Sequence, residues 1–173
     1  MSAPTDPVTG QLTPKVAAGS DLDAATLYAL LALRVDVFIV EQQAIDPELD
    51  HRDLAPGVTQ VWYEAVPSPG APAQGSPIAG TDRVVVAGAR LVAAPAAAPG
   101  ADAALGRVVV HPAWRGAGVG AAVVRRALAC TEEPVACKAQ EHLVDWYTRF
   151  GFVPDGERFT WAGIPHLPLR LTR

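Results

Sequence analysis

Residues 108–130 read VVVHPAWRGAGVGAAVVRRALAC, and this stretch decides the fold. The apolar run Val108–Val110 is typical of a buried strand, and residues 121–130 are typical of a helix. Between them lies RGAGVG (Arg115–Gly120), a turn in which every second residue is glycine. Glycine lets the backbone adopt positive φ and approach a ligand closely. Because the N–H groups and the dipole of a helix start attract anions, the stretch predicts a strand–turn–helix unit that binds a phosphate or pyrophosphate.

Two familiar phosphate-binding loops fit this turn less well. A Walker A loop needs Lys and then Ser or Thr after its last glycine, whereas Ala121 and Ala122 follow Gly120. A Rossmann fingerprint lies at the first strand of a long doubly wound domain, with an acidic residue about twenty positions later. Too few residues follow Gly120 for the remaining strands of such a domain. A tight connection in which the glycines only permit packing is the structural alternative.

The composition indicates a globular protein: 50% of its 173 residues are hydrophobic and 18% are charged. A net charge of −4 gives no basis for non-specific binding to nucleic acid or to an anionic membrane. No run approaches the roughly 18 apolar residues of a membrane span, and residues 1–14 lack the pattern of a signal peptide. We therefore expect a cytoplasmic location. The two cysteines, Cys130 and Cys137, are expected to be reduced thiols rather than a disulfide or metal site.

The organisation along the chain predicts a flexible tail over residues 1–14 and a single domain over residues 15–173. Ser20–Asp23 offers N-cap oxygens for a long helix over residues 23–40. Two loops rich in Pro and Ala are expected at 67–82 and 94–102. Further helices are expected after the glycine turn and at 141–149, and strands at 15–18, 59–66, 83–93, 104–110, 135–139, 152–154, 157–161 and 166–171. This order predicts an α/β fold, a mixed sheet flanked by helices on both faces.

A second constellation lies in QEHLVDWYTRFGF, residues 140–152. Leu143, Trp146 and Phe150 share one face of a helix that we expect to enter the core. Tyr147 lies at the edge of that face, where its hydroxyl could point into a cleft between two β-α units. The alternative is a core tyrosine whose hydroxyl meets a backbone carbonyl.

Together the two segments resemble the paired motifs of the GNAT superfamily of acyl-CoA N-acyltransferases. RGAGVG resembles its R/Q-x-x-G-x-G/A loop, and AQEHLVDWYTRFGF its later N-x-x-A-x-x-(F/L)-Y-x-x-x-G-F pattern. LYALLALRVDVFIVEQ, ELDHRD and GIPHLPL resemble the ElaA-like branch, so the resemblance covers most of residues 23–171. The chain departs from the pattern where Gln140 replaces the usual Asn, Leu143 the common Ala, and Gln60 a His that is frequent in the branch.

The resemblance implies the fold of that superfamily and acetyl-CoA as co-substrate, with no metal. The turn would hold the pyrophosphate, the preceding strand would pair with the pantetheine arm, and Tyr147 would protonate the departing thiolate. The cofactor-binding residues expected on this basis are Val108, Val109, Val110, Arg115, Gly116, Ala117, Gly118, Val119, Gly120 and Gln140.

The acceptor side begins with Arg34, which interrupts the apolar face of the first helix. One interpretation is an ion pair between Arg34 and Glu41, Asp50 or Asp53, since a buried charge needs a partner. The other is that these groups line an acceptor pocket. Arg34, Gln42, Asp50 and His166 are then the candidate substrate-binding residues, and Glu41 is a second catalytic candidate that accepts the amine proton. His111 is interpreted as a spacer. Carboxylates in such a pocket predict a cationic amine.

The expected function is transfer of an acetyl group from acetyl-CoA to a primary amine, on a small molecule or a peptide, by direct attack on the thioester. Acyl-homoserine-lactone synthesis and a non-catalytic acyl-CoA sensor are the alternatives, since fold does not fix function. The sequence leaves a monomer and a homodimer both open.

Overall fold

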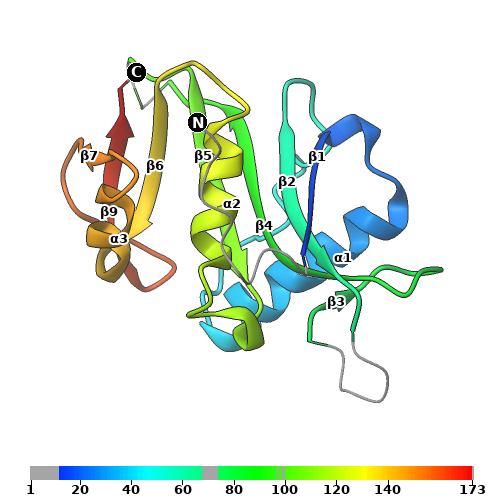
Figure 1. Ribbon diagram of the computed structural model, residues 1–173. Coiled ribbons are helices and arrows are strands. Elements are labelled where there is room, and N and C mark those ends of the chain that lie inside the picture. The colour runs from blue at the N-terminus through cyan, green and yellow to red at the C-terminus, as the bar shows by residue number, and fades with distance from the viewer. Residues whose placement is uncertain (1–11, 68–73, 97, 99, 173) are drawn as a thin grey trace.

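The structure is a computed structural model that describes residues 12–67, 74–96, 98 and 100–172. In this part of the chain a mixed sheet has the strand order β1-β2-β4-β5-β6-β9-β7, with β3 paired to β4 and β8 paired to β9 (Figure 1). The strands are β1 (Thr13–Ala18), β2 (Thr59–Ala65), β3 (Ser76–Pro77), β4 (Val84–Ala93), β5 (Ala103–Val110), β6 (Val135–Gln140), β7 (Val153–Pro154), β8 (Phe159–Trp161) and β9 (Ile164–Leu171).

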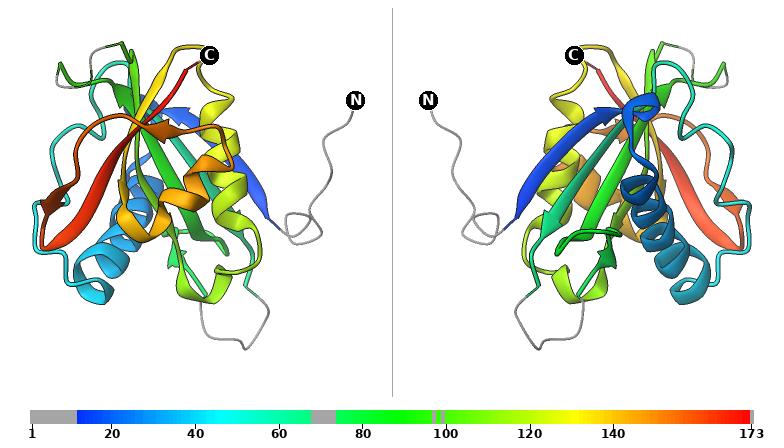
Figure 2. Two further views of the ribbon diagram at one scale, coloured as in Figure 1. Left: turned by 90° about the vertical axis from the view of Figure 1, so that its left-hand side faces the viewer. Right: turned by 90° about the vertical axis from the view of Figure 1, so that its right-hand side faces the viewer.

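Helices cover both faces of the sheet, as the two side views in Figure 2 show. Helix α1 (Ala24–Arg34) continues into the π-helical segment η3 (Val35–Glu41) on one face. Helices α2 (Val119–Leu128) and α3 (Val144–Thr148) cover the other face. Three short 3₁₀ turns complete the helical elements of the described residues: η2 (Gly19–Asp21), η4 (Pro112–Trp114) and η5 (Glu141–Leu143).

Each face of the sheet has its own apolar cluster beneath the helices that cover it. Under α1 the cluster is centred on Leu33, Val37 and Val85, whereas Val123 and Phe152 belong to the larger cluster under α2 and α3. The start of α1 is fixed by Asp23, whose carboxylate accepts a hydrogen bond from the backbone N–H of Thr26 at 2.9 Å. Such an N-cap stabilises a helix by about 1 kcal/mol.

The feature that positions the site is the divergence of β5 and β6. These parallel strands pair only at Ala103–Leu105, and the last pair joins Leu105 to Cys137. Beyond that pair, residues 106–110 of β5 keep their hydrogen bonds to β4 on one side alone. Arg107 lies at this point with a left-handed φ of 55°, and the β4–β5 register shifts between Gly88 and Arg90. The sheet therefore opens into a V from Gly106 onward.

The predicted fold class is confirmed, and the differences are local. Strand β1 begins at Thr13 and Leu12 is buried, so ordered packing starts before residue 15; the rest of the expected tail, residues 1–11, lies outside the described residues. The expected helix 23–40 changes to a π-helical pitch at Val35. Strand β3 falls in a segment expected to be a loop. Cys130 and Cys137 are both free thiols. Among the described residues, no helix is both long and apolar enough to span a bilayer.

Candidate active site

The glycine turn joins the end of β5 to α2. Gly116 and Gly118 have φ values of 77° and 81°, which L-residues rarely adopt, and Gly118 is the N-cap of α2 without a side-chain cap. The first helical hydrogen bond runs from Ala122 N to Gly118 O, so the preceding N–H groups have no acceptor within the helix. Gly120 has another role, because a Cβ there would lie 3.4 Å from Val110 Cγ2 and 3.5 Å from Trp146 Cζ2. The backbone N–H groups at the start of α2 are thus available as hydrogen-bond donors.

Arg115, the first residue of the turn, is already occupied. Its two terminal nitrogens donate to the two carboxylate oxygens of Glu41 at 2.6 and 2.7 Å, and its Nε donates to Val110 O at 3.1 Å. This ion pair lowers the pKa of Glu41, first through the hydrogen bond from Arg115. Glu41, one of the three carboxylates considered as a partner of Arg34, is therefore paired with Arg115 and links the end of η3 to the glycine turn.

A cleft of about 660 Å³ occupies the V between β5 and β6. One wall comes from η3 and the segment after it, and the other from α3 and the β8–β9 hairpin. Val108 lines the cleft, whereas Val109 packs under α1 because side chains alternate along a strand. The predicted site residues that line the cleft are Val108, Gln140, Tyr147, Gln42, Asp50 and His166.

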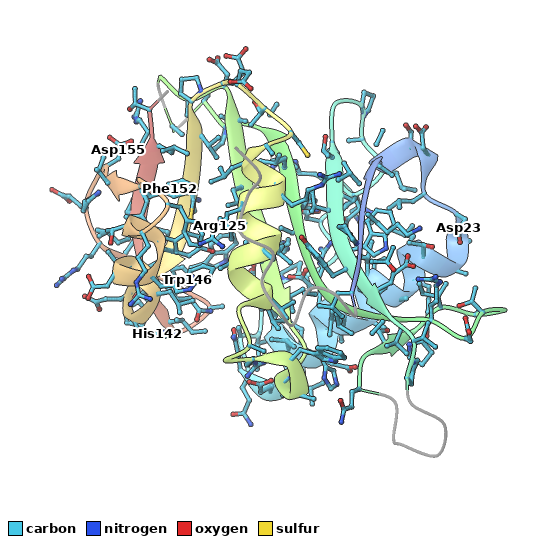
Figure 3. The ribbon with its side chains drawn as sticks, viewed as in Figure 1. Asp23, Arg125, His142, Trp146, Phe152 and Asp155 are labelled. Atoms are coloured by element: carbon cyan, nitrogen blue, oxygen red, sulfur yellow. The ribbon has the colours of Figure 1, made fainter. Side chains whose placement is uncertain are left out.

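Tyr147 is a buried residue of this cleft with an ionisable hydroxyl. Its side chain is 5% exposed and is packed edge-on against Trp146 and Phe152, which Figure 3 labels on the α3 side of the sheet. Burial raises the pKa of Tyr147 well above its usual value, and the interaction with the adjacent thiol of Cys137 raises it further. Burial likewise raises the pKa of Cys137 to about 12. Both groups are therefore protonated at neutral pH.

A network of buried ion pairs lies beside the cleft on the side nearest α1, and only part of it lines the cleft. Arg34, 3% exposed, contacts Glu48 and donates to Asp53 Oδ1 at 2.6 Å. Arg90 joins Asp53, at 3.0 Å, to Asp50, at 2.5 Å. Arg107 Nε lies 2.9 Å from Glu48 Oε1, at an angle that makes no hydrogen bond. Three cations and three carboxylates thus neutralise one another.

This network decides between the two interpretations of Arg34. The ion-pair interpretation is confirmed with Asp53, while Asp50 pairs with Arg90 instead. Arg34 does not line the cleft. Gln60, at the position where the branch often has His, donates to Asp53 Oδ1 at 3.0 Å and so belongs to the same network.

Several lining residues were not found from the sequence. Glu48 lies in the ELDHRD segment, but Arg90, Arg107, Lys138 and Asp46 belong to no motif, and only the fold brings them to the cleft. Gln42 and Gln140 were expected at separate subsites, yet Gln140 Nε2 donates to Gln42 Oε1 at 3.0 Å. His111 accepts from Ala113 N at 3.3 Å and caps η4, in keeping with a spacer. Among the described residues, no group of three His, Cys, Asp or Glu side chains is arranged to hold a metal ion.

Comparison with known proteins agrees with this arrangement. Residues 45–173 match the family model of the acetyltransferase (GNAT) domain. A UPF0039 protein of Mycobacterium tuberculosis is 36% identical over 150 residues, 86% of each chain. The protein ElaA of Escherichia coli is 32% identical over 153 residues, 86% of this chain and 88% of ElaA.

Solved structures show the same relation. An acyl-CoA N-acyltransferase from Pseudomonas aeruginosa superimposes with a TM-score of 0.76 and 32% identity, covering 93% of this chain and 99% of that one. The crystal structure of E. coli ElaA gives a TM-score of 0.74 and 30% identity, covering 92% and 99%. The resemblance stated from the sequence is confirmed: this chain belongs to the GNAT acetyltransferase family, among its ElaA-like members.

Proposed function

We propose that the protein transfers an acetyl group from acetyl-CoA to the primary amine of an acceptor by direct attack on the thioester. The observation that carries this proposal is the position of Tyr147, a buried proton donor in the cleft where β5 and β6 part. The neighbouring edge of β5, residues 106–110, is unpaired on the cleft side. An extended ligand arm can add to such an edge through main-chain hydrogen bonds.

The open N–H groups at the start of α2 suit the pyrophosphate at the other end of the same ligand. A helix N-terminus combines unpaired donors with a positive dipole end. Val108 and Val110 flank the path from this turn into the V, and Gln140 lines the cleft opposite. We propose Arg115, Gly116, Ala117, Gly118, Val119 and Gly120 as the pyrophosphate segment.

The chemistry needs one proton donor. The amine nitrogen attacks the carbonyl carbon of the thioester, and the C–S bond of the tetrahedral intermediate then breaks. We propose that Tyr147 gives its proton to the departing thiolate sulfur and regains one from solvent, into which the amine proton is released. A positioned general acid contributes about 10²-fold or more to such a step. The raised pKa of Tyr147 keeps this proton in place up to alkaline pH.

The amine proton has no assigned acceptor among the groups lining the cleft. Glu41, the candidate from the sequence, is held by Arg115 and lies outside the lining. We propose it as a base only for a state in which Arg115 has moved onto the phosphate of the co-substrate.

Release of free thiol from acetyl-CoA tests the proposal, measured over a panel of chemically diverse primary amines. At least one amine should give saturable turnover. The Tyr147→Phe variant, which keeps the ring and its packing, should lose about 10²-fold in kcat with little change in Tm. A parent protein that binds CoA but acetylates no amine would contradict the proposal, and equal rates for the Phe variant would remove Tyr147 from it.

A further inference from the structure

Lys138 lines the cleft, and its ammonium is outside the ion pairs formed by the described carboxylates. It lies on β6 between Cys137 and Ala139, which pack under α2 and α3, so its side chain projects to the α1 face of the sheet. Its Nζ lies 5.0 Å from the centroid of the Trp161 ring and 5.4 Å from that of Phe159. Among the described residues, Lys138 forms no ion pair.

The carboxylates that line the cleft are mostly committed elsewhere. Glu48 and Asp50 belong to the arginine network, and Asp155 pairs with Arg170. Asp46 is the exception, since its Oδ2 accepts from the neutral Trp161 Nε1 at 2.8 Å. The expectation of an acidic acceptor pocket built on Asp50 is therefore not supported by the charges. Lys138, over the face of the Trp161 ring, and Asp46, at its indole nitrogen, are thus outside the ion pairs of the described residues.

The two rings beneath the Lys138 ammonium, those of Phe159 and Trp161, are held by further contacts. Trp161 is held through its indole nitrogen by Asp46, and His166 stacks on Phe159 with ring centroids 5.6 Å apart. His166 is itself anchored through Nδ1, 2.8 Å from Ile164 O. A cation over two rings is attracted by their faces but keeps its N–H donors free for an anion. The Phe159 and Trp161 rings thus orient the ammonium of Lys138 in the cleft.

We propose that the acceptor is an amine that also carries an anionic group, and that Lys138 binds this group while Asp46 attracts the ammonium end. The inference deepens the proposed function and rests on it for the identity of the reaction. The shared chemistry is an anion on a short amine, and both a carboxylate and a phosphate supply it. A charge-assisted hydrogen bond to Lys138 would discriminate such an amine from its neutral counterpart.

Matched pairs of amines test this assignment: glycine against glycinamide, and phosphoethanolamine against ethanolamine. The parent protein should favour the anionic member of at least one pair in kcat/KM. Lys138→Met, which keeps chain length and removes charge, should lower kcat/KM for that member by about tenfold or more and spare the neutral one. Lys138→Arg should retain the preference. Lys15→Met, a change at the other lysine of the chain, on β1, should leave both unchanged.

Binding separates this assignment from the proposed reaction. Calorimetry in the presence of CoA should give a lower Kd for the anionic member than for the neutral one, and Lys138→Met should abolish the difference. If no amine is acetylated but this difference is found, the reaction fails and the anion site stands. Equal Kd values within both pairs, or equal losses for anionic and neutral amines in Lys138→Met, would overturn the assignment of Lys138.

Discussion

At the scale of single residues, Tyr147, the proposed proton donor, lies beside the thiol of Cys137, and both residues line the cleft. Both side chains are buried, and the thiol interacts with the phenol at the point where β5 and β6 separate. We infer that Cys137 positions the hydroxyl of Tyr147. Burial raises the pKa of the Cys137 thiol to about 12, so the thiol stays protonated at neutral pH and is a poor nucleophile.

A double-mutant cycle checks this role. Cys137→Ala should lower kcat by about fivefold, the value of one hydrogen bond, in the parent protein, and by nothing further in Tyr147→Phe. Because Cys137 raises the pKa of Tyr147, its removal should also move the alkaline limb of the pH–rate profile to lower pH. Cys130→Ala, at an exposed cysteine, is the matched control. Equal losses of kcat in both backgrounds would make Cys137 a packing residue only.

At the scale of elements, variants of Gly118 test whether the glycine turn binds the pyrophosphate of CoA. This residue caps α2 at a positive φ that Asn and Asp tolerate better than other L-residues. Gly118→Asp should place a carboxylate beside the open N–H groups, and it should weaken CoA binding by about tenfold or more relative to Gly118→Asn. Calorimetry with CoA measures the difference, and Tm values check that both variants fold. Similar Kd values for the two variants would place the pyrophosphate elsewhere.

The sequence predicted the helices and strands better than the tertiary contacts between them. The RGAGVG turn, the helix after it and the segment of Tyr147 were found because their local patterns are strong. The π-helical pitch of η3 was not, since Val35–Glu41 has no glycine or proline to mark it. The sequence did not predict Arg90, Arg107 and Lys138 as site residues, because no local pattern distinguishes them from other strand residues. Only the pairing of β4, β5, β6 and β9 brings them to one cleft.

At the scale of the whole molecule, the buried network joins α1, the segment after η3, β4 and β5. Removing one member leaves a buried charge without a partner, which costs far more than losing an exposed pair. Arg34→Met should therefore lower the free energy of unfolding by about 3–5 kcal/mol in denaturant titration. Arg158→Met, which breaks the exposed pair with Glu141, should change it by less than about 0.5 kcal/mol. A small loss for Arg34→Met would show that the network adds little to stability.

The same network determines how the free energy of unfolding changes at acidic pH. Burial alone would raise the pKa of Asp53, but the hydrogen bond and charge of Arg34 outweigh it, and the pKa lies below the ordinary 3.8. The hydrogen bonds from Arg90 lower the pKa of Asp50. Their contribution to stability is therefore complete above pH 3.8 and is lost as pH falls through the lowered values. Between pH 5 and 8 the network should leave the free energy of unfolding unchanged.

The ion pair of Glu41 with Arg115 connects the two halves of the molecule, because it ties the end of η3 to the turn before α2. A phosphate that binds Arg115 must displace this carboxylate. Glu41→Gln should then lower the Kd of CoA, by about fivefold at most since both side chains are partly exposed, and the gain should shrink at high salt. Arg115→Met in the Glu41→Gln background should remove the gain.

The second role proposed for Glu41, as a base, adds a prediction for the same variant. If Glu41 also accepts the amine proton once Arg115 has moved onto the phosphate, Glu41→Gln should lower kcat in addition to lowering the Kd of CoA. Measuring both quantities on one protein preparation therefore shows whether Glu41 only competes for Arg115 or also acts as a base. We expect the Kd to move, because the pKa of Glu41 is already lowered by Arg115 and a carboxylate so engaged is a poor proton acceptor until the phosphate replaces it.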